Sequence, residues 1–296
     1  IHNAAASGAA ILTGQLDAFG FVSNDMFEES EGDSKPDQYK APATWAQTVT
    51  LNTDTGVLKD PKIRQALHLA TSRQDIAKAA AKKFSFSISR WSPPGPFATP
   101  GDVVAVMPGY REAKDVDRAR AKELLAEAGH PDGIKGLKHL ARGTGSDPGP
   151  TALGFIDQAK QHLGMEFEVV MEETSIYWDT VRARDFDSTT GVPASTLADP
   201  SDSWGQWFKT GGPQNYAGYS NPEFDDLWLK IAAELDPAVR REYVNRGEQI
   251  LDRDMPMVFV GWMAVNRMWQ TDVKDWYFGK TGTYIVLRYG TTWLDR

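Results

Sequence analysis

The sequence predicts a mostly parallel α/β fold, and three observations support this prediction. Between residues 137 and 192, strand-like and helix-like patterns alternate in the order β-α-β-α-β, which is typical of layered domains with parallel strands. Helix starts recur in which Asp or Asn precedes Pro, at Asp60, Asn221 and Asp236. The length of 296 residues suggests about two domains.

The N-terminal part is expected to contain short elements and one surface loop. Residues 9–14 predict a short helix that ends at Gly14, and residues 16–22 and 48–52 predict strands. Residues 28–43 are acidic, contain Pro and hold few apolar side chains, so we expect a surface loop there.

The best-defined helix begins at Asp60, a good N-cap, with Pro61 at the first helical position. Apolar residues then recur at helical spacing up to Ala70. Ser72 with Asp75 three residues later predicts a capping-box-like restart and a second helix to about residue 83.

The second half is expected to hold most of the regular structure. The segment 92–109 is rich in Pro and Gly, which indicates an irregular connector. Strands are expected at 137–142, 166–172, 186–192, 258–269 and 283–289, and helices at 116–128, 151–163 and 176–184 and after Asn221 and Asp236.

Composition excludes several classes of function. The net charge of −8 disfavours nucleic acid and anionic membrane as partners. The chain has no Cys, so disulfides and thiolate metal sites are excluded. The longest apolar run, residues 257–265, is too short to cross a bilayer. Because the chain starts at Ile1 without Met or a leader, we expect a processed chain or an internal fragment.

Enzymatic motifs are weak. The five His residues show no metal-ligand spacing, and no GxSxG, P-loop or GxGxxG-after-strand pattern occurs. The pairs Glu28-Glu29 and Glu172-Glu173 are adjacent, and adjacent residues of a strand point to opposite faces. Such carboxylates cannot work together as acid and base. We therefore expect no catalysis, no cofactor and no metal.

Residues 51–76, LNTDTGVLKDPKIRQALHLATSRQDI, resemble the signature of family 5 extracellular solute-binding proteins, the peptide, nickel and opine receptors of bacterial ABC importers. Further similar motifs follow in the same order: AKELLAEAGHPDG (121–133), GMEFEVVMEE (164–173), RDFDSTTG (184–191), ADPSDSW (198–204) and NYAGYSNPEFDDL (215–227). The resemblance covers nearly the whole chain, from about residue 9 to residue 296.

The resemblance implies lobes of the periplasmic-binding-protein type II kind, joined by a hinge. It implies that residues 1–84 are part of domain I, residues 85–275 form domain III, and residues 276–296 return to domain I. The N-terminal part of domain I and all of domain II are then absent from this chain. It further implies a monomer that is periplasmic, or extracellular and membrane-tethered. This monomer binds a small polar solute, closes over it and docks on a membrane permease.

The resemblance places ligand binding in residues 191–200, where an edge strand offers its backbone to an extended ligand. In peptide-binding members, a carboxylate four residues before the Pro holds the ligand's α-amino group. Here Thr196 occupies that position, so either Asp199 takes over or the ligand lacks a free amine. The alternative is that Asp199 only caps a helix.

Aromatic and polar residues supply further candidates. Ten Trp residues suggest an aromatic-lined cleft, although core packing explains most individual Trp side chains. The best ligand candidates are Trp91 in the connector, Trp204 after the binding segment, Arg90 as a carboxylate clamp, Asn215 and Tyr216 in a Gly-flanked loop, and Phe21 and Asn24 from domain I. Arg90 can equally be a solvated side chain at a strand end, and residues 21–24 an ordinary exposed loop.

Two other functions stay open. A carbohydrate-active enzyme with a Trp-lined cleft would need two carboxylates roughly 5–10 Å apart across that cleft. A receptor of the same fold could serve signalling or chemotaxis, and the sequence does not separate this role from transport. The expected solutes are an oligopeptide, an opine or amino-acid conjugate, or a short saccharide.

Overall fold

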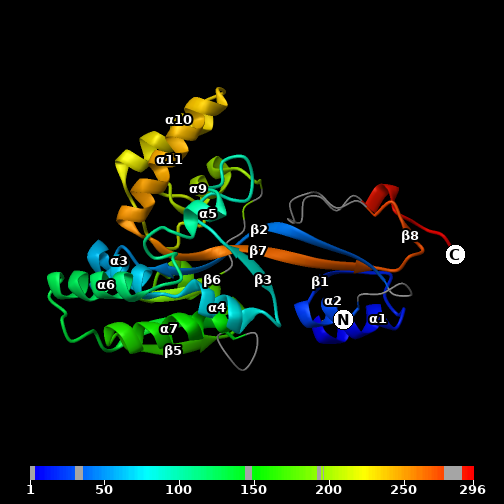
Figure 1. Ribbon diagram of the computed structural model, residues 1–296, viewed down its shortest axis with the longest axis horizontal. Helices are drawn as coiled ribbons and strands as arrows, with labels where there is room; N and C mark the ends of the chain where they lie inside the picture. The colour runs from blue at the N-terminus through cyan, green and yellow to red at the C-terminus, as the bar shows by residue number, and fades with distance from the viewer. Residues whose placement is uncertain (1–3, 31–35, 144–148, 192–194, 196, 277–288) are drawn as a thin grey trace.

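The computed structural model describes residues 4–30, 36–143, 149–191, 195, 197–276 and 289–296. These residues form two units that are joined by a pair of long strands (Figure 1). We call residues 46–262 the large lobe, and the described parts of residues 4–45 and 263–296 the small unit. Both ends of the chain lie in the small unit (Figure 1).

The small unit holds short elements, and two strands extend from it into the large lobe. Its own elements are α1 (Ala4–Leu12), β1 (Ala18–Val22), α2 (Asn24–Glu29), β8 (Val273–Lys274), the short 3-10 helix η3 (Tyr289–Thr291) and β9 (Trp293–Leu294). The shared strands are β2 (Asp37–Leu51) and β7 (Met257–Trp269).

The large lobe contains most of the helices. Its elements are the 3-10 helix η1 (Val57–Lys59), α3 (Pro61–Ala70), α4 (Arg73–Ala80), β3 (Ser85–Ile88), α5 (Gly101–Val104), α6 (Asp115–Glu127), β4 (Leu137–Arg142), α7 (Pro150–Leu163), β5 (Phe167–Glu172), α8 (Thr174–Ala183), β6 (Ser188–Gly191), α9 (Pro200–Trp207), α10 (Pro222–Ala233) and α11 (Pro237–Asp254). Among the described helices, none has both the length and the apolar character of a bilayer-spanning segment.

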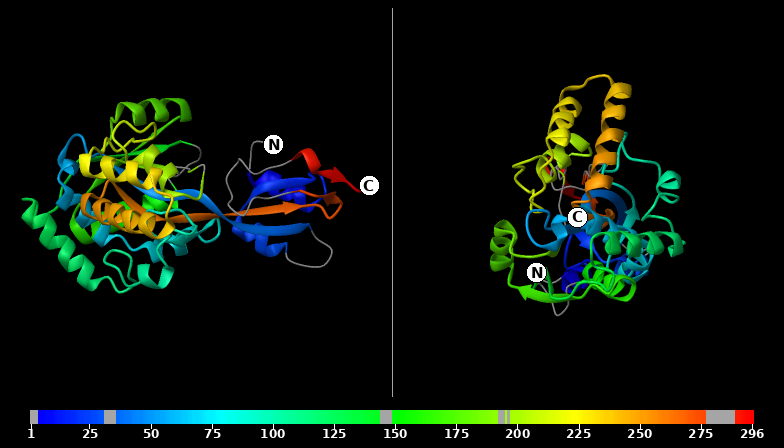
Figure 2. Two further views of the ribbon diagram at one scale, coloured as in Figure 1. Left: turned by 90° about the horizontal axis from the view of Figure 1, so that it is seen from above. Right: turned by 90° about the vertical axis from the view of Figure 1, so that its left-hand side faces the viewer.

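One sheet runs through both units, in the order β1-β7-β2-β6-β4-β5, with β3 beside β7. Strand β4 pairs in parallel with both β5 and β6, which confirms the predicted α/β class. Strands β2 and β7 pair antiparallel from the small unit into the large lobe, and their register shifts twice between Pro42 and Thr48. These irregularities lie where the strands pass from one unit to the other (Figure 2).

Separate hydrophobic cores form on the two faces of the sheet in the large lobe. Helices α3, α6 and α7 cover one face, where Leu67, Leu124 and Phe155 belong to one buried cluster. Helices α9, α10 and α11 enclose a second, aromatic-rich cluster that also contains Trp262 of β7. The small unit has its own cluster around Ile11 and Met268.

Local capping chemistry explains the helix boundaries that the sequence predicts. The Asp60 side chain accepts a hydrogen bond from the Lys62 N–H at 2.8 Å, and α3 begins at Pro61. The Ser72 hydroxyl accepts from the Asp75 N–H at 3.3 Å and so restarts the chain as α4.

Two expectations need correction. Residues 28–43 are not one surface loop, because α2 continues to Glu29 and β2 already begins at Asp37. The expected domain border at residue 84 does not follow the packing. Val49 and Leu67 share one buried cluster with Leu124, so the border between the units lies near residue 45. Residues 283–288 of the expected last strand lie outside the described residues.

Candidate ligand-binding site

The carboxyl ends of the parallel strands β4, β5 and β6 lie on the side of the large lobe that faces the small unit (Figure 1). In open α/β sheets, ligands bind in the crevice outside the carboxyl ends of the strands. Helices α7 and α8 begin at this same edge. The edge is therefore the first place to look for a ligand site.

Strand β6 reaches this edge as an internal strand. It pairs with β2 over Ser188–Gly191 on one side and with β4 on the other. Of the segment 191–200, in which an edge strand was expected, Gly191 already pairs with Thr48 of β2. Residues 192–194 and Thr196 lie outside the described residues.

A buried histidine holds the underside of β6 in place. The His139 ring is within hydrogen-bond distance of the Ser188 hydroxyl through Nδ1 (2.8 Å) and of the Thr190 hydroxyl through Nε2 (2.9 Å). Burial lowers the pKa of His139 to about 4, so the ring is neutral at pH 7. It therefore positions the strand and brings no charge to the edge.

An aromatic recess lies on the other face of β6. The rings of Trp178 and Tyr216 are 5.8 Å apart, and with Thr50, Gly191 and Gln214 they line a cavity of about 40 Å³. Burial raises the pKa of Tyr216, which keeps its hydroxyl neutral. The recess offers apolar ring surface and hydroxyl groups, and it has room for one small group.

Asp202 is the carboxylate that organises the segment expected to bind ligand. Its Oδ2 accepts from the Ser195 hydroxyl at 2.7 Å and from the Leu197 N–H at 3.0 Å. The sequence reasoning missed this residue. The available signal was a carboxylate in the first turn of the helix that follows the segment.

The Asp199 carboxylate makes structural contacts within the large lobe. It caps α9 by accepting from the Ser201 N–H at 2.9 Å, and the Nη1 and Nη2 atoms of Arg240 donate to it at 2.7 and 2.6 Å. Burial alone raises its pKa, but hydrogen bonds from Arg240 and Ser201 outweigh this effect, and the pKa lies below its usual value. Its charge is compensated, so it does not replace the missing carboxylate at position 196.

Trp91, Trp204 and Arg90 belong to the interior of the large lobe. Both Trp rings have 0% exposure, so neither offers a face to a ligand in this structure. Arg90 is buried between Glu248 and Asp252 of α11, with which it forms ion pairs. In place of the expected ligand contacts, the two Trp rings pack in the core and Arg90 belongs to a buried ionic cluster.

The remaining candidates are spread over two places. Asn215 is buried and ties its own loop, since it donates to Tyr219 O at 2.7 Å and accepts from the Tyr219 N–H at 3.0 Å. Asn24 joins the two units, because its Nδ2 donates to Ala81 O at 2.7 Å. The Phe21 side chain lies outside the described part of the structure. Of the expected ligand residues, the structure brings Tyr216 to the carboxyl edge.

Comparison with known proteins gives the family. The model of "Bacterial extracellular solute-binding proteins, family 5 Middle" matches residues 1–215. The periplasmic oligopeptide-binding protein OppA of Escherichia coli is 22% identical over 258 residues, covering 87% of this chain and 46% of OppA. The oligopeptide-binding protein OppA of Bacillus subtilis is 25% identical over 264 residues, covering 82% and 45%.

Solved structures show the same fold. DppA of Helicobacter pylori in complex with the peptide STSA superposes with a TM-score of 0.79 at 20% identity, covering 100% of this chain and 56% of DppA. AppA of Bacillus subtilis in complex with a nonapeptide gives 0.78 at 20%, covering 100% and 59%. The chain spans about half the length of the curated relatives it matches. It belongs to the family 5 bacterial extracellular solute-binding proteins.

Proposed function

We propose that this chain is part of the solute receptor of an ABC importer and captures an oligopeptide-like solute at the carboxyl edge of the large lobe. The observation that carries the proposal is the placement of this edge, with the Trp178–Tyr216 recess, opposite a second unit on a two-strand hinge. Family membership and the peptide complexes of DppA and AppA support the solute class. The closed form, in which both units contact the solute, is the form that a permease would receive.

The amino end of the solute distinguishes this receptor from the peptide-binding pattern. Thr196 lacks the charge of a carboxylate, and Asp199 is neutralised by Arg240. Both oxygens of Asp202 already accept hydrogen bonds, from Ser195, Leu197 and Gln206. A buried ammonium needs a negative partner. We therefore propose that the solute carries a modified or conjugated amino end, as in an N-acylated peptide or an opine. Export to the periplasm or cell exterior, and docking as a monomer, belong to the same proposal, which the periplasmic relatives support.

The alternative of a glycoside-cleaving enzyme gains no support from the carboxylates at this edge. The Thr180 hydroxyl donates to Glu172 at 2.6 Å, and Glu173 accepts from the Ser175 N–H at 3.1 Å as the N-cap of α8. Both carboxylates are thus hydrogen-bonded to residues of α8. A signalling receptor would use the same site and differ only in its docking partner.

Calorimetric titration with matched peptides tests the proposal. We expect N-acetylated tripeptides to bind at least as tightly as their free-amine forms, and Tyr216→Ala to weaken binding at least fivefold. Tyr243→Ala is the control, because Tyr243 packs on the aromatic core of α11, away from the edge. Equal binding by Tyr216→Ala and the native chain, or strict dependence on a free amine, would contradict the proposal.

A further inference from the structure

Asp202 begins a chain of side-chain hydrogen bonds that ends at the Trp178–Tyr216 recess. Gln206 Nε2 donates to Asp202 Oδ1 at 3.0 Å. Gln214 Nε2 in turn donates to Gln206 Oε1 at 2.7 Å, and Gln214 lines the recess. We call the side chains of Asp202, Gln206 and Gln214 the amide relay.

Further hydrogen bonds anchor both ends of the amide relay. At one end, the Leu197 N–H and the Ser195 hydroxyl donate to Asp202 Oδ2 at 3.0 and 2.7 Å. At the other end, the Gln214 N–H donates to Gln206 O at 3.0 Å, which fixes the loop before α10 to α9. The relay therefore joins the segment expected to bind ligand to the wall of the recess.

The Asp202 carboxylate sets the orientation of both glutamine amides. The oxygen and the nitrogen of such an amide are told apart by their hydrogen-bond partners. An ionised carboxylate only accepts hydrogen bonds, so Gln206 presents its Nε2 to Asp202 and its Oε1 to Gln214. Gln214 then donates through Nε2, and no described residue donates to its Oε1. The relay therefore ends in a hydrogen-bond acceptor on a residue that lines the recess.

The other walls of the recess favour a neutral ligand group. Trp178, Val181 and Met257 contribute ring, aliphatic and thioether surface. Burial raises the pKa of Tyr216, so its hydroxyl brings no charge. A charged group would lose its hydration here without a counter-charge. The group that best matches these walls and the Gln214 acceptor is a neutral hydrogen-bond donor.

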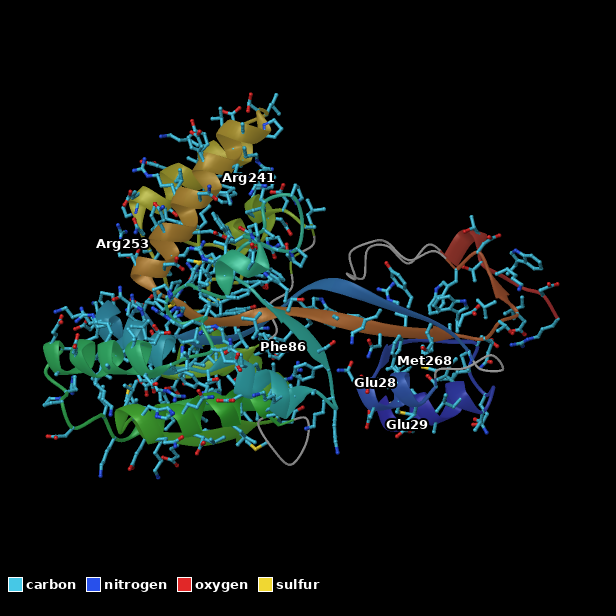
Figure 3. All side chains as sticks on the ribbon, in the orientation of Figure 1. Glu28, Glu29, Phe86, Arg241, Arg253 and Met268 are labelled. Carbon is cyan, nitrogen blue, oxygen red and sulfur yellow. The ribbon has the colours of Figure 1, made fainter. Side chains whose placement is uncertain are left out.

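The amide relay lies within the large lobe. Its first two members belong to α9, and Gln214 belongs to the loop before α10. Arg241 and Arg253 of α11, labelled in Figure 3, mark the same lobe, and the labelled Met268 marks the small unit. Each hydrogen bond of the relay joins two residues of the large lobe, so the acceptor is in place before the two units close on a ligand.

We propose that Asp202 determines specificity at the recess, because it orients Gln206 and Gln214 so that the recess selects a small neutral group that donates a hydrogen bond, a hydroxyl or an amide N–H. Asp202 is a positioning residue, since it acts on the ligand through the two glutamines. The selectivity rests on the peptide function proposed above, whereas the orientation of the relay can be measured without any ligand.

Asp202→Asn should reverse the amide relay with little change in side-chain volume. The Leu197 N–H can only donate, so it keeps the new amide oxygen on its side and turns the amide nitrogen toward Gln206. Gln206 then accepts through Oε1 and donates through Nε2 to Gln214 Oε1. The uncommitted atom of Gln214 becomes its nitrogen, which can only donate.

Nuclear magnetic resonance of the ligand-free chain tests the orientation of the relay. In the native chain, we expect a Gln214 side-chain amide hydrogen to exchange with solvent about tenfold more slowly than those of the exposed Gln15, because Gln206 Oε1 holds it. In Asp202→Asn this hydrogen loses its acceptor, so its exchange should approach that of Gln15. Equal exchange of the two residues in the native chain, or unchanged Gln214 exchange in the variant, would overturn the proposal.

Calorimetric titration tests the selectivity. The probes are N-acetyl-trialanine peptides in which each position in turn carries serine or O-methylserine. The serine hydroxyl donates a hydrogen bond, whereas the methyl ether only accepts, and one neutral hydrogen bond changes affinity roughly two- to tenfold. At the position that enters the recess, we expect the native chain to prefer serine over the ether, and Asp202→Asn to lower this preference about threefold. The ether is larger in both titrations, so the change in preference reports the hydrogen bond.

Two further variants complete the test. Asp226→Asn removes the same charge from an exposed position of α10 and should leave both the Gln214 exchange and the serine preference unchanged. Gln214→Leu leaves the Leu197 anchor intact and should abolish the serine preference. A serine preference that survives both Asp202→Asn and Gln214→Leu would overturn the proposal. If no peptide binds the native chain, the peptide function and the selectivity fail together, while the Gln214 exchange still shows whether Asp202 orients the relay.

Discussion

Replacement of Arg90 by Met tests how the connector that follows β3 is fastened to α11. Glu248 is the centre of this attachment. Arg90 Nη1 donates to it at 2.6 Å, the Ser92 hydroxyl at 2.8 Å and the Thr99 hydroxyl at 2.8 Å, while Arg90 Nη2 donates to Asp252. The side chains of Arg90 and Glu248 are only 9% and 1% exposed.

The burial of this cluster sets the expected magnitude. Burial raises the pKa of Glu248 and of Asp252, and the charge of Arg90 opposes that rise. Removing the cation leaves the buried Glu248 carboxylate and the half-buried Asp252 carboxylate without their main compensating charge. Breaking a buried pair in this way costs about 3–5 kcal/mol of unfolding free energy. Native domains are stable by about 5–15 kcal/mol, so the variant should still fold at 25 °C.

Urea denaturation at pH 7 measures this cost, and Arg246→Met is the matched control. Arg246 also pairs from α11, with Glu223, but the two side chains are 62% and 43% exposed, so the control should lose at most about 1 kcal/mol. A loss below 1 kcal/mol for Arg90→Met would refute the reasoning.

The pH dependence gives a second check on Arg90→Met. In this variant the folded-state pKa values of the two carboxylates lie above their unfolded values, so the folded chain binds more protons as the pH falls. The stability deficit relative to the native chain should therefore shrink between pH 7 and pH 5.

Three further predictions concern other parts of the fold. Burial lowers the folded-state pKa of His139 to about 4, so the neutral ring contributes to stability above pH 6.5. This contribution is lost as the pH falls toward 4, which lowers the unfolding free energy by up to about 3 kcal/mol. In urea denaturation from pH 7 to 4, the unfolding free energy of His139→Gln should therefore decline less than that of the native chain. Gly247→Ala should destabilise the chain by about 1–3 kcal/mol in thermal or urea unfolding, because the added methyl group would clash with the Trp204 ring. This clash should outweigh the helix propensity of Ala, so a stabilised variant would contradict the packing. Asn24→Ala should lower the unfolding free energy by about 1–3 kcal/mol, because it removes the donor to Ala81 O and the acceptor of Asn266 Nδ2. Amide hydrogen exchange at the start of α2 should then accelerate. Unchanged exchange there would show that these hydrogen bonds do not hold the two units together.

Local signals in the sequence predicted the elements whose causes are local. The caps at Asp60 and Ser72 and the alternating β-α-β-α-β pattern depend on residues within a few positions of each other, and the structure contains the corresponding helices and strands. The family signature in residues 51–76 likewise indicated the receptor fold that the solved structures share.

Long-range pairing explains what the sequence did not predict. The stretch from Asp37 to Thr50 is polar at its start, yet it forms a strand because β7, more than 200 residues later, pairs with it on both sides of the irregular residues 43–45. The same strand shows why the border between the units lies near residue 45. Its C-terminal half contributes Val49 to a core of the large lobe, whereas its N-terminal half pairs with β7 at Met268, which belongs to the cluster of the small unit. Pattern reasoning has no access to a partner so distant in the chain.

The sequence by itself therefore determined the fold class, the capped helices and the family. The tertiary structure decided which side chains are available to a ligand. Trp91, Trp204 and Arg90 looked suitable by residue type, but packing and charge pairing between distant elements bury them, while Tyr216 stays at the carboxyl edge. The physical reason is that residue type sets what a side chain can bind, whereas only its three-dimensional neighbours decide whether that capacity is already used.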